Sequence, residues 1–306
     1  MSQIDVLQLF HTLHGHENEG FATIHAPVQH SGEGIPYLQV PGVVVLSRPR
    51  VEMAGLTGFL DGFDPELKFP EYPADPTPLP DGAQLSKVAG QLCYMSFGPK
   101  RSLNEQAKRY FDNLKSSGHG SVFEHATYSL LLYGISRSVT HELIRHRAGF
   151  GYSQLSQRFV SGKMLRFVER PEYQTDEQLH TLFLQRIERA AGEYAALAER
   201  LLEMQKSGVS ILSAEARTDL RKKVQQAARS VLPNETEAPI VVTGNVRAWR
   251  HVIEERASAH AETEIRALAL RIFLCLRLAD PVLFDDYTVE ELPDGTYTVK
   301  TDFVKV

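Results

Sequence analysis

The stretch Arg137–Arg158, RSVTHELIRHRAGFGYSQLSQR, decides how the rest of this chain is interpreted. It holds four Arg, two His, three Ser and two Gln in 22 residues, and Glu142 is its only acid. The chain of 306 residues has a formal net charge of −5, so a basic island of this kind needs a reason. A guanidinium is a rigid fork of donors that binds phosphate or carboxylate through two hydrogen bonds. The stretch therefore predicts a binding site for phosphorylated ligands.

A helix is expected in the first half of this stretch, capped by Ser136 or Ser138 and continuing to about Arg147. Three consecutive helical residues spread over ~200°. Arg145, His146 and Arg147 would then face different partners, with one ligand on each side of the helix. A solvated basic helix end, favoured by the helix dipole, is the alternative interpretation.

The second half of the stretch begins with a break. Gly149 and Gly151 are two residues apart, which interrupts a helix and lets the backbone come close to a ligand. Residues 157–172 are expected to be extended. Ser156 and Arg158 would then lie on one side of the chain, where they could bind a phosphate together.

The two histidines of the stretch suggest zinc, but their spacing argues against it. His141 and His146 are five residues apart, which places them ~140° apart around a helix. No cluster of Cys and His occurs elsewhere in the sequence. We therefore expect no metal site.

Composition narrows the class of protein. A pI near 6.2 argues against a general nucleic-acid binder. The first residues lack a basic, apolar signal peptide, and no run approaches ~20 apolar residues, so we expect no membrane span. The two cysteines, Cys93 and Cys275, are too few for a disulfide framework and favour a reducing, cytoplasmic setting.

Hydrophobic periodicity and turn residues outline the remaining elements. Strands are expected at 42–53, 127–133 and 239–244. Helices are expected at 84–95, 104–117, 176–207, 215–230, 245–257 and 261–278. Six prolines make residues 63–82 a surface connection, and Asp294-Gly295 predicts a hairpin within residues 287–306.

Two of these helices have an expected buried face. In the helix 84–95 it consists of Leu85, Val88, Ala89, Leu92 and Cys93. In the helix 176–207 it consists of Leu179, Phe183, Ile187, Ala190, Tyr194, Leu197, Leu201 and Met204.

Four segments, in this order, resemble one family. They are HGSVFEH (119–125), RHR (145–147) followed by SQR (156–158), ARSVLP (228–233), and Asn245-Val246-Arg247 with His251 and Arg256. Together they resemble the signature of the flavin-dependent thymidylate synthases (ThyX) and cover about residues 85–287. Eight residues separate RHR from SQR here, one more than the family pattern, and we place the extra residue within 148–151.

The resemblance implies roles for individual residues. Residues that would bind FAD are Ser121, Arg145, His146, Arg147, Gln154, Asn245, Val246, Arg247 and His251. Residues that would bind dUMP are Glu142, Leu143, Ile144, Arg145, Gln154, Leu155, Ser156, Gln157, Arg158, Arg229 and Arg256. Arg256 would also activate the uracil ring, and family members are homotetramers with sites shared between subunits.

The chemistry of the residues is consistent with these roles. Methylation of uracil at C5 needs an electron-rich C5, which a Cys thiolate or a fixed cation can promote. Cys275 lies in an apolar helix and is expected in the core, whereas Arg256 is charged at any working pH. No side chain supplies hydride, so a cofactor is required. Because no Gly-x-Gly-x-x-Gly fingerprint is present, a flavin would need a non-Rossmann site.

The resemblance and the elements together imply an α/β (α+β) enzyme with a twisted, largely antiparallel sheet flanked by long helices. We expect a ThyX-like catalytic domain at 41–286, an N-terminal extension at 1–40 and a C-terminal β-hairpin at 287–306. The expected reaction converts dUMP, 5,10-methylenetetrahydrofolate and NADPH to dTMP, tetrahydrofolate and NADP. Two alternatives stay open: a paralogous flavoenzyme acting on another pyrimidine nucleotide, and a non-catalytic nucleotide- or RNA-binding protein.

Overall fold

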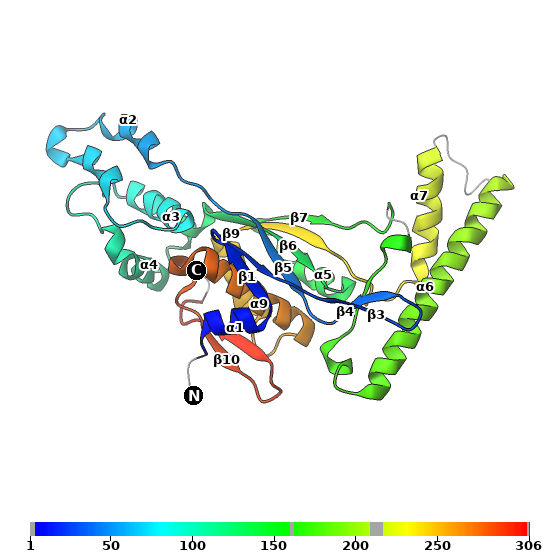
Figure 1. Ribbon diagram of the computed structural model, residues 1–306. Helices are drawn as coiled ribbons and strands as arrows, with labels where there is room; N and C mark the ends of the chain where they lie inside the picture. The colour runs from blue at the N-terminus through cyan, green and yellow to red at the C-terminus, as the bar shows by residue number, and fades with distance from the viewer. Residues whose placement is uncertain (1–3, 160–161, 209–216, 305) are drawn as a thin grey trace.

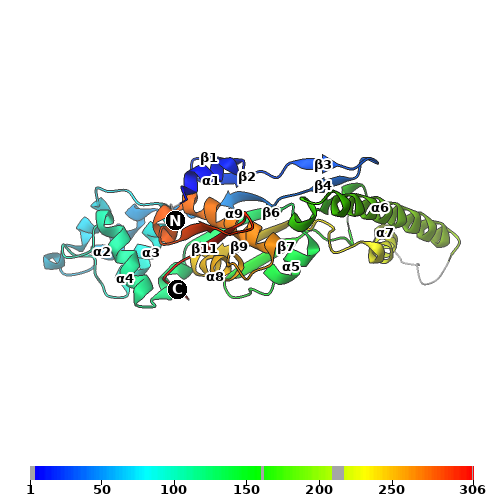
Figure 2. The same cartoon turned by 90° about the horizontal axis from the view of Figure 1, so that it is seen from below.

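A six-stranded antiparallel sheet forms the centre of an elongated molecule (Figures 1 and 2). The structure is a computed structural model and describes residues 4–159, 162–208, 217–304 and 306. The strand order is β1 (Gly15–Asn18), β2 (Phe21–Ile24), β5 (Gly42–Ser47), β6 (Thr127–Tyr133), β9 (Ile240–Asn245) and β7 (Phe150–Gln154). Every neighbouring pair is antiparallel, which confirms the expected sheet type.

The N-terminal 40 residues contribute more than the sequence analysis expected. They were expected to be an extension, but β1 and β2 form one edge of the main sheet. The next residues form β3 (Val28–His30) and β4 (Pro36–Leu38), and β4 pairs in parallel with β8 (Phe167–Val168) in a second, small sheet.

The core lies between the sheet and the helices packed on one of its faces. Along β6 the side chains alternate, and Tyr128, Leu130 and Leu132 are buried. Helix α9 (Thr263–Ala279) packs on β2 and β5, α1 (Val6–Thr12) packs on α9, and α8 (Val246–Arg256) lies beside α9. Burying apolar area of this kind stabilises a fold by ~25 cal/mol per Å².

Helix α8 is fixed to the C-terminal part of the chain by a buried ion pair. Arg250 is 1% exposed and donates to both carboxylate oxygens of Asp286, each at 2.8 Å. Lys115 also contacts Asp286 at 2.8 Å. Although burial opposes the charge, these two cations hold the pKa of Asp286 well below its usual range. The pair keeps α8 in place, which matters because α8 carries several of the expected site residues.

One end of the molecule contains α2 (Thr57–Leu60), α3 (Asp81–Leu92) and α4 (Ala107–Ser116), as Figure 1 shows. The expected strand 42–53 ends at Ser47. The proline-rich connection contains the 3-10 turns Pro65–Leu67 and Phe69–Ala74. It is not only surface, because Phe69 and Tyr72 form a small separate core with Leu60 and Phe97.

The predicted buried face of α3 is wrong. Leu92 is 47% exposed and Cys93 is exposed, whereas Gln84, Lys87 and Gln91 are buried. The polar face is inside because it belongs to a hydrogen-bonded network. Lys87 Nζ donates to Asn104 Oδ1 at 2.5 Å, and Gln91 accepts from the Tyr72 hydroxyl at 2.6 Å.

The other end is formed by the long helix α6 (Glu177–Lys206) and by α7 (Arg217–Ala228), which packs against it (Figure 2). The predicted face of α6 is buried from Phe183 to Tyr194 only, whereas Leu179 and Leu197 are 40% and 38% exposed. Residues 215–216 of the expected second helix lie outside the described residues.

Two expectations, for the basic stretch and for the segment after it, are wrong, and the expected C-terminal hairpin is confirmed. Helix α5 (Arg137–Leu143) is capped by Ser136 but ends before the Arg-His-Arg segment, so those residues are not helical. In the expected extended segment 157–172, the described residues 157–159, 162–164 and 171–172 form turns, and only β8 is a strand among the described residues. The C-terminal hairpin is confirmed by β10 (Thr288–Glu291) and β11 (Tyr297–Lys300), which follow α10 (Pro281–Phe284).

Candidate functional site

The C-terminal end of α8 meets the basic stretch at Arg256. Its Nε donates to His146 Nε2 at 2.9 Å, and its Nη1 donates to Glu142 Oε2 at the same distance. Arg256 is 24% exposed and Glu142 is 36% exposed, so the cluster opens to solvent. The structure thus brings together an expected catalytic cation, an expected flavin contact and an expected substrate contact.

His146 is kept neutral by its surroundings. Burial, the Arg256 guanidinium and the neighbouring His251 ring lower the pKa of His146 to about 4. The two imidazole rings meet edge to face, with centroids 5.3 Å apart. A neutral His146 can accept the hydrogen bond from Arg256 without repelling it.

The chain path past α5 is fixed by Tyr152 on β7. Its hydroxyl donates to the carbonyl oxygens of His146 at 2.5 Å and Leu143 at 3.1 Å. Burial raises the pKa of Tyr152 to about 12, so the hydroxyl remains a donor. Gln154, two residues along the same strand, donates to Thr140 Oγ1 at 2.9 Å. These bonds replace the helical continuation that the sequence predicted.

Gly149 makes the turn between the Arg-His-Arg segment and β7. Its φ is +77°, and a Cβ at this position would lie 2.8 Å from Asn245 Nδ2. Asn245 caps α8 by accepting from the amide of Ala248 at 2.9 Å. From Phe150 onward β7 pairs with β9 in unbroken register. An extra residue within 148–151 is therefore most simply accommodated in the turn at 148–149.

A second group of expected flavin contacts lies at the N-terminal end of α8. Ser121 and Arg247 line a cavity of about 360 Å³ together with Cys93, His119 and Gly120. Arg247 pairs with Glu124 at 2.5 Å, and its guanidinium lies against Gly120, where a Cβ would be 2.8 Å from Arg247 Nε. Arg247 and His251 are four residues apart and share the exposed side of α8, so this face connects the cavity with the Arg256 cluster.

The expected phosphate contacts form a third group. Residues 157–159 are a turn, in which the Arg158 amide donates to Ser156 Oγ at 3.3 Å. The expected extended arrangement of Ser156 and Arg158 is therefore wrong, although the two residues do lie together. Burial and the nearby Arg229 guanidinium lower the pKa of Arg137, which places a further cation beside Arg229.

The other expected residues differ in their exposure. The side chains of Leu143 and Val246 are fully buried, and the Val246 amide donates to the Ala126 carbonyl at 2.9 Å. Ile144 is 39% exposed. Arg145 and Arg147 are exposed, and no carboxylate of the described residues forms an ion pair with either. Gln157 is 9% exposed, and its Nε2 has no partner within the described part of the chain.

Sequence reasoning missed three contributors. Nothing in the sequence marks Tyr152 as a site residue except its position close to the Arg-His-Arg segment. Glu124 lies in the quoted HGSVFEH segment, and its charge opposite Arg247 becomes visible only in three dimensions. Gln226 on α7 contacts Arg158, 68 positions earlier in the sequence. Glu142, the one acid of the basic stretch, pairs with Arg256.

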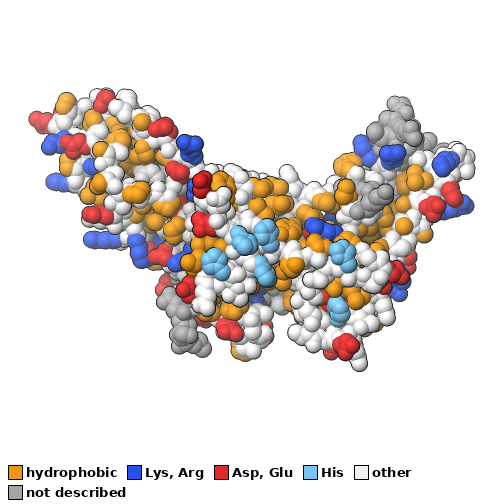
Figure 3. Space-filling view, viewed as in Figure 1, with side chains coloured by type: hydrophobic (Ala, Val, Ile, Leu, Met, Phe, Trp, Pro, Cys, Tyr) orange, Lys and Arg blue, Asp and Glu red, His pale blue; other side chains and the backbone are white. Residues whose placement is uncertain are grey.

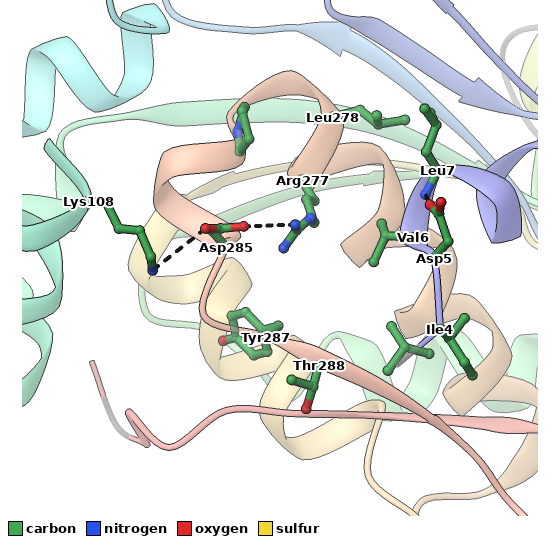
Figure 4. Close-up of a pocket in the computed structure, with 12 residues that line it drawn as sticks. Ile4, Asp5, Val6, Leu7, Lys108, Arg277, Leu278, Asp285, Tyr287 and Thr288 are labelled. Carbon is green, nitrogen blue, oxygen red and sulfur yellow. Dashed lines mark hydrogen bonds and ion pairs between the residues drawn. The ribbon is translucent and has the colours of Figure 1, made fainter. Parts of the chain in front are cut away.

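A larger cavity of about 670 Å³ lies elsewhere, between α1, α9, α10 and β10. Lys108 and Arg277 point into it, and both pair with Asp285, at 3.6 and 2.8 Å (Figure 4). It shares no residue with the expected site. Its two cations are already neutralised in part by Asp285, so it is a weaker anion site than the basic stretch.

No three His, Cys, Asp or Glu side chains of the described residues are grouped to hold a metal ion. None of the helices that the structure describes is long and apolar enough to cross a membrane.

Comparison with known proteins gives consistent results. The family model of "Thymidylate synthase complementing protein" matches residues 77–282. A flavin-dependent thymidylate synthase of Mycobacterium sp. (strain KMS) is 43% identical over 236 residues, which are 77% of this chain and 91% of the relative. One of Corynebacterium aurimucosum is 46% identical over 213 residues, or 69% of this chain and 82% of the relative.

A solved structure shares the fold. The crystal structure of the UMP/dUMP methylase PolB from Streptomyces cacaoi, bound with 5-Br dUMP, has a TM-score of 0.50 and 21% sequence identity. The alignment covers 67% of this chain and 88% of that protein. With the family match over residues 77–282 and relatives above 40% identity, the chain belongs to the flavin-dependent thymidylate synthase family.

Proposed function

We propose that this protein methylates C5 of the uracil ring of dUMP. The carbon would come from 5,10-methylenetetrahydrofolate and the reducing equivalents from NADPH through bound FAD. The observation that carries the proposal is the cluster of Arg256, His146 and Glu142, which joins the end of α8 to the basic stretch. The names of relatives at 43–46% identity support the same reaction.

Arg256 would act on the substrate as a fixed positive charge. Electron density must increase at C5 for the new carbon bond, and negative charge then develops on the uracil ring. A guanidinium held by two partners needs little reorganisation to stabilise that charge, which is the basis of electrostatic catalysis. Neutral His146 holds Arg256 without competing with the ring for its charge. Glu142 would keep the guanidinium oriented until substrate binds.

The residues at both ends of α8 fit FAD. Ser121 and Arg247 line the 360 Å³ cavity, and the exposed guanidinium groups of Arg145 and Arg147 suit a diphosphate. His146 and His251 meet edge to face, Gln154 ends β7, and Asn245 directly precedes α8, so each could add a polar group. Val246 would contribute no side-chain contact, because that side chain is buried. FAD, when bound, supplies the hydride chemistry that no side chain offers.

The dUMP phosphate would bind to the third group of residues. Arg158 bonds to Gln226 of α7, Ser156 bonds to the Arg158 amide, and Arg229 directly follows α7. The Arg229 charge also lowers the pKa of Arg137, after the effect of burial. Guanidinium groups near one another repel, so an anion between them would be favourable. The unpaired, buried Nε2 of Gln157 is a further donor in this region.

A homotetramer with shared sites would suit the shape of the molecule. In Figure 3 the two ends rise on either side of a broad saddle, whose surface carries hydrophobic side chains. The edge strand β7 lies between the two ends in Figure 1, and its outer side pairs with no described strand. Another subunit seated there would lie next to Arg145 and Arg147.

Both cysteines are free in the structure, which suits the reducing conditions of the cytoplasm.

Product analysis tests the proposal. The purified protein is incubated with FAD, NADPH, methylenetetrahydrofolate and an equimolar mixture of dUMP and UMP, and the nucleotides are identified by mass spectrometry. We expect dTMP to accumulate. Methylated UMP as the main product would support the paralogue, which the name of the structurally similar methylase also suggests. No methylated nucleotide, with no flavin retained, would support a binding protein instead.

A further inference from the structure

Helix α7 contacts the expected phosphate-binding turn through Gln226, which bonds to Arg158, and through Lys222, whose Nζ lies 5.2 Å from the centroid of the Phe159 ring. With the Gln226 amide oriented so that its oxygen faces the turn, that oxygen accepts from Arg158 Nη2 at 2.9 Å and from Arg158 Nε at 2.7 Å. Gln226 lies near the end of α7 and is half-buried, whereas Arg158 is exposed. A long, exposed side chain is thus tied at two atoms to a helix.

The remaining contact of the Arg158 guanidinium is also uncharged. It lies over the Phe159 ring, with 5.4 Å from its central carbon to the ring centroid. No carboxylate of the described residues forms an ion pair with Arg158, whereas Arg166, Arg186, Arg247 and Arg256 each have one. Arg158 is therefore oriented by neutral groups, and its charge is not cancelled.

This arrangement leaves Arg158 able to bind an anion. A guanidinium has five N–H donors, and Gln226 uses two of them. The others stay available for phosphate oxygens. The Gln226 amide orients the Arg158 side chain without adding a negative charge that would compete with phosphate. The Arg158 side chain has therefore already lost its conformational freedom before the substrate binds.

We propose that Gln226 is a positioning residue for the substrate phosphate, acting through Arg158. The inference rests on the proposed function, because it takes Arg158 as a contact of the dUMP phosphate. Helix α7 carries none of the other expected contacts, although Arg229 directly follows it. The inference gives α7 a direct part in substrate affinity.

The first experiment measures dUMP and deoxyuridine affinity by calorimetry on the flavin-loaded protein. Gln226→Leu removes the acceptor, and we expect dUMP to bind roughly 3- to 10-fold more weakly, as for loss of one neutral hydrogen bond. Affinity for deoxyuridine, which lacks the phosphate, and kcat at saturating dUMP should not change. Gln225→Leu, the adjacent position on the same helix, is the matched control and should behave as the unmodified protein.

Two further variants separate positioning from a structural role. In an Arg158→Ala background, Gln226→Leu should cause no additional loss, since Gln226 then has nothing to position. Gln226→Glu keeps the reach of the side chain but adds a charge that competes with phosphate, so it should also weaken dUMP binding.

The outcomes distinguish this inference from the proposed function. If Arg158→Ala weakens dUMP binding and Gln226→Leu does not, the positioning role is wrong while the phosphate assignment stands. An equal loss of dUMP and deoxyuridine affinity in Gln226→Leu would also overturn it. If Arg158→Ala leaves dUMP affinity unchanged, the phosphate assignment fails and the role of Gln226 fails with it.

Discussion

Arg256 at the end of α8 donates a hydrogen bond from Nε to Nε2 of His146, at 2.9 Å. His146 must therefore present a lone pair at Nε2 and carry its proton on Nδ1. The bond links a residue of the C-terminal segment to one of the basic stretch, 110 positions earlier. Arg256 is therefore held in this position only while His146 is neutral. The proposed reaction depends on the charge of Arg256.

The first prediction concerns pH and follows from the pKa of His146, which is lowered to about 4. In the unfolded chain the pKa is about 6.5. Because the folded state prefers the neutral ring, its contribution to stability is complete above pH ~6.5 and is lost as the pH falls toward 4. Between pH 7.5 and 5 the free energy of unfolding should fall less in His146→Gln than in the unmodified protein. Exposed His141, changed to Gln, is the control and should leave the difference unaltered.

The second prediction concerns Arg256. Arg256→Ala should abolish methyl transfer but retain flavin, because the other expected flavin contacts remain. Arg256→Lys keeps the charge but loses the two-pronged contact with His146 and Glu142, so we expect intermediate activity. Turnover and flavin absorbance are measured on the same preparations. Near-normal turnover of Arg256→Ala would remove Arg256 from its role.

The third prediction concerns the phosphate. Arg158→Ala should weaken dUMP binding by roughly 10- to 100-fold, the effect of losing a charge-assisted hydrogen bond of about 1.5–3 kcal/mol. Calorimetric titration at two salt concentrations checks it, and the salt dependence should decrease as well. Arg200, exposed on α6 and paired with Glu203, provides a control in Arg200→Ala. Equal affinities for the two variants would show that the phosphate binds elsewhere.

The fourth prediction concerns the turn before β7. Gly149→Ala introduces a side chain at φ +77° and within 2.8 Å of Asn245 Nδ2. We expect a loss of about 1–3 kcal/mol in stability and reduced flavin retention, since the Asn245 cap of α8 must shift. Gly151→Ala is the matched control, because a Cβ there meets nothing within 4 Å. Thermal unfolding with and without added FAD distinguishes the two variants, and identical melting behaviour would contradict the role of Gly149.

The fifth prediction concerns the anchor of α8. Asp286→Asn leaves Arg250 and Lys115 buried without a full counter-charge, and breaking a buried pair in this way costs about 3–5 kcal/mol. Asp285→Asn removes the exposed pairs with Lys108 and Arg277 and should cost less than about 1 kcal/mol. Denaturant titration compares the two. A small effect of Asp286→Asn would mean that α8 is held by its apolar face alone.

The sequence predicted the elements whose pattern is local. The strands β6 and β9 follow β-branched and apolar runs, and the cap of α8 at Asn245 was included in its expected range. The family resemblance assigned Arg256 and the basic stretch to one expected site, and in the structure Arg256 bonds to His146 and Glu142. These features depend on residues close in sequence or on a motif with fixed spacing.

The failures have long-range causes. Helix α5 ends early because the Tyr152 hydroxyl takes the carbonyls of Leu143 and His146. The face of α3 is reversed because Lys87 finds Asn104, and no periodicity reveals such a partner. Strands β1 and β2 are short, and their place in the sheet depends on pairing with β5. In each case a contact with a residue outside the helix or strand itself overrides the local preference.

The measurement that tests the central claim most directly is the visible absorption spectrum of the purified, FAD-incubated protein. It is recorded anaerobically after NADPH is added, with and without dUMP. The account predicts a flavin band that bleaches, and bleaches faster when dUMP is present. A protein that shows no flavin band after incubation with FAD would contradict the account.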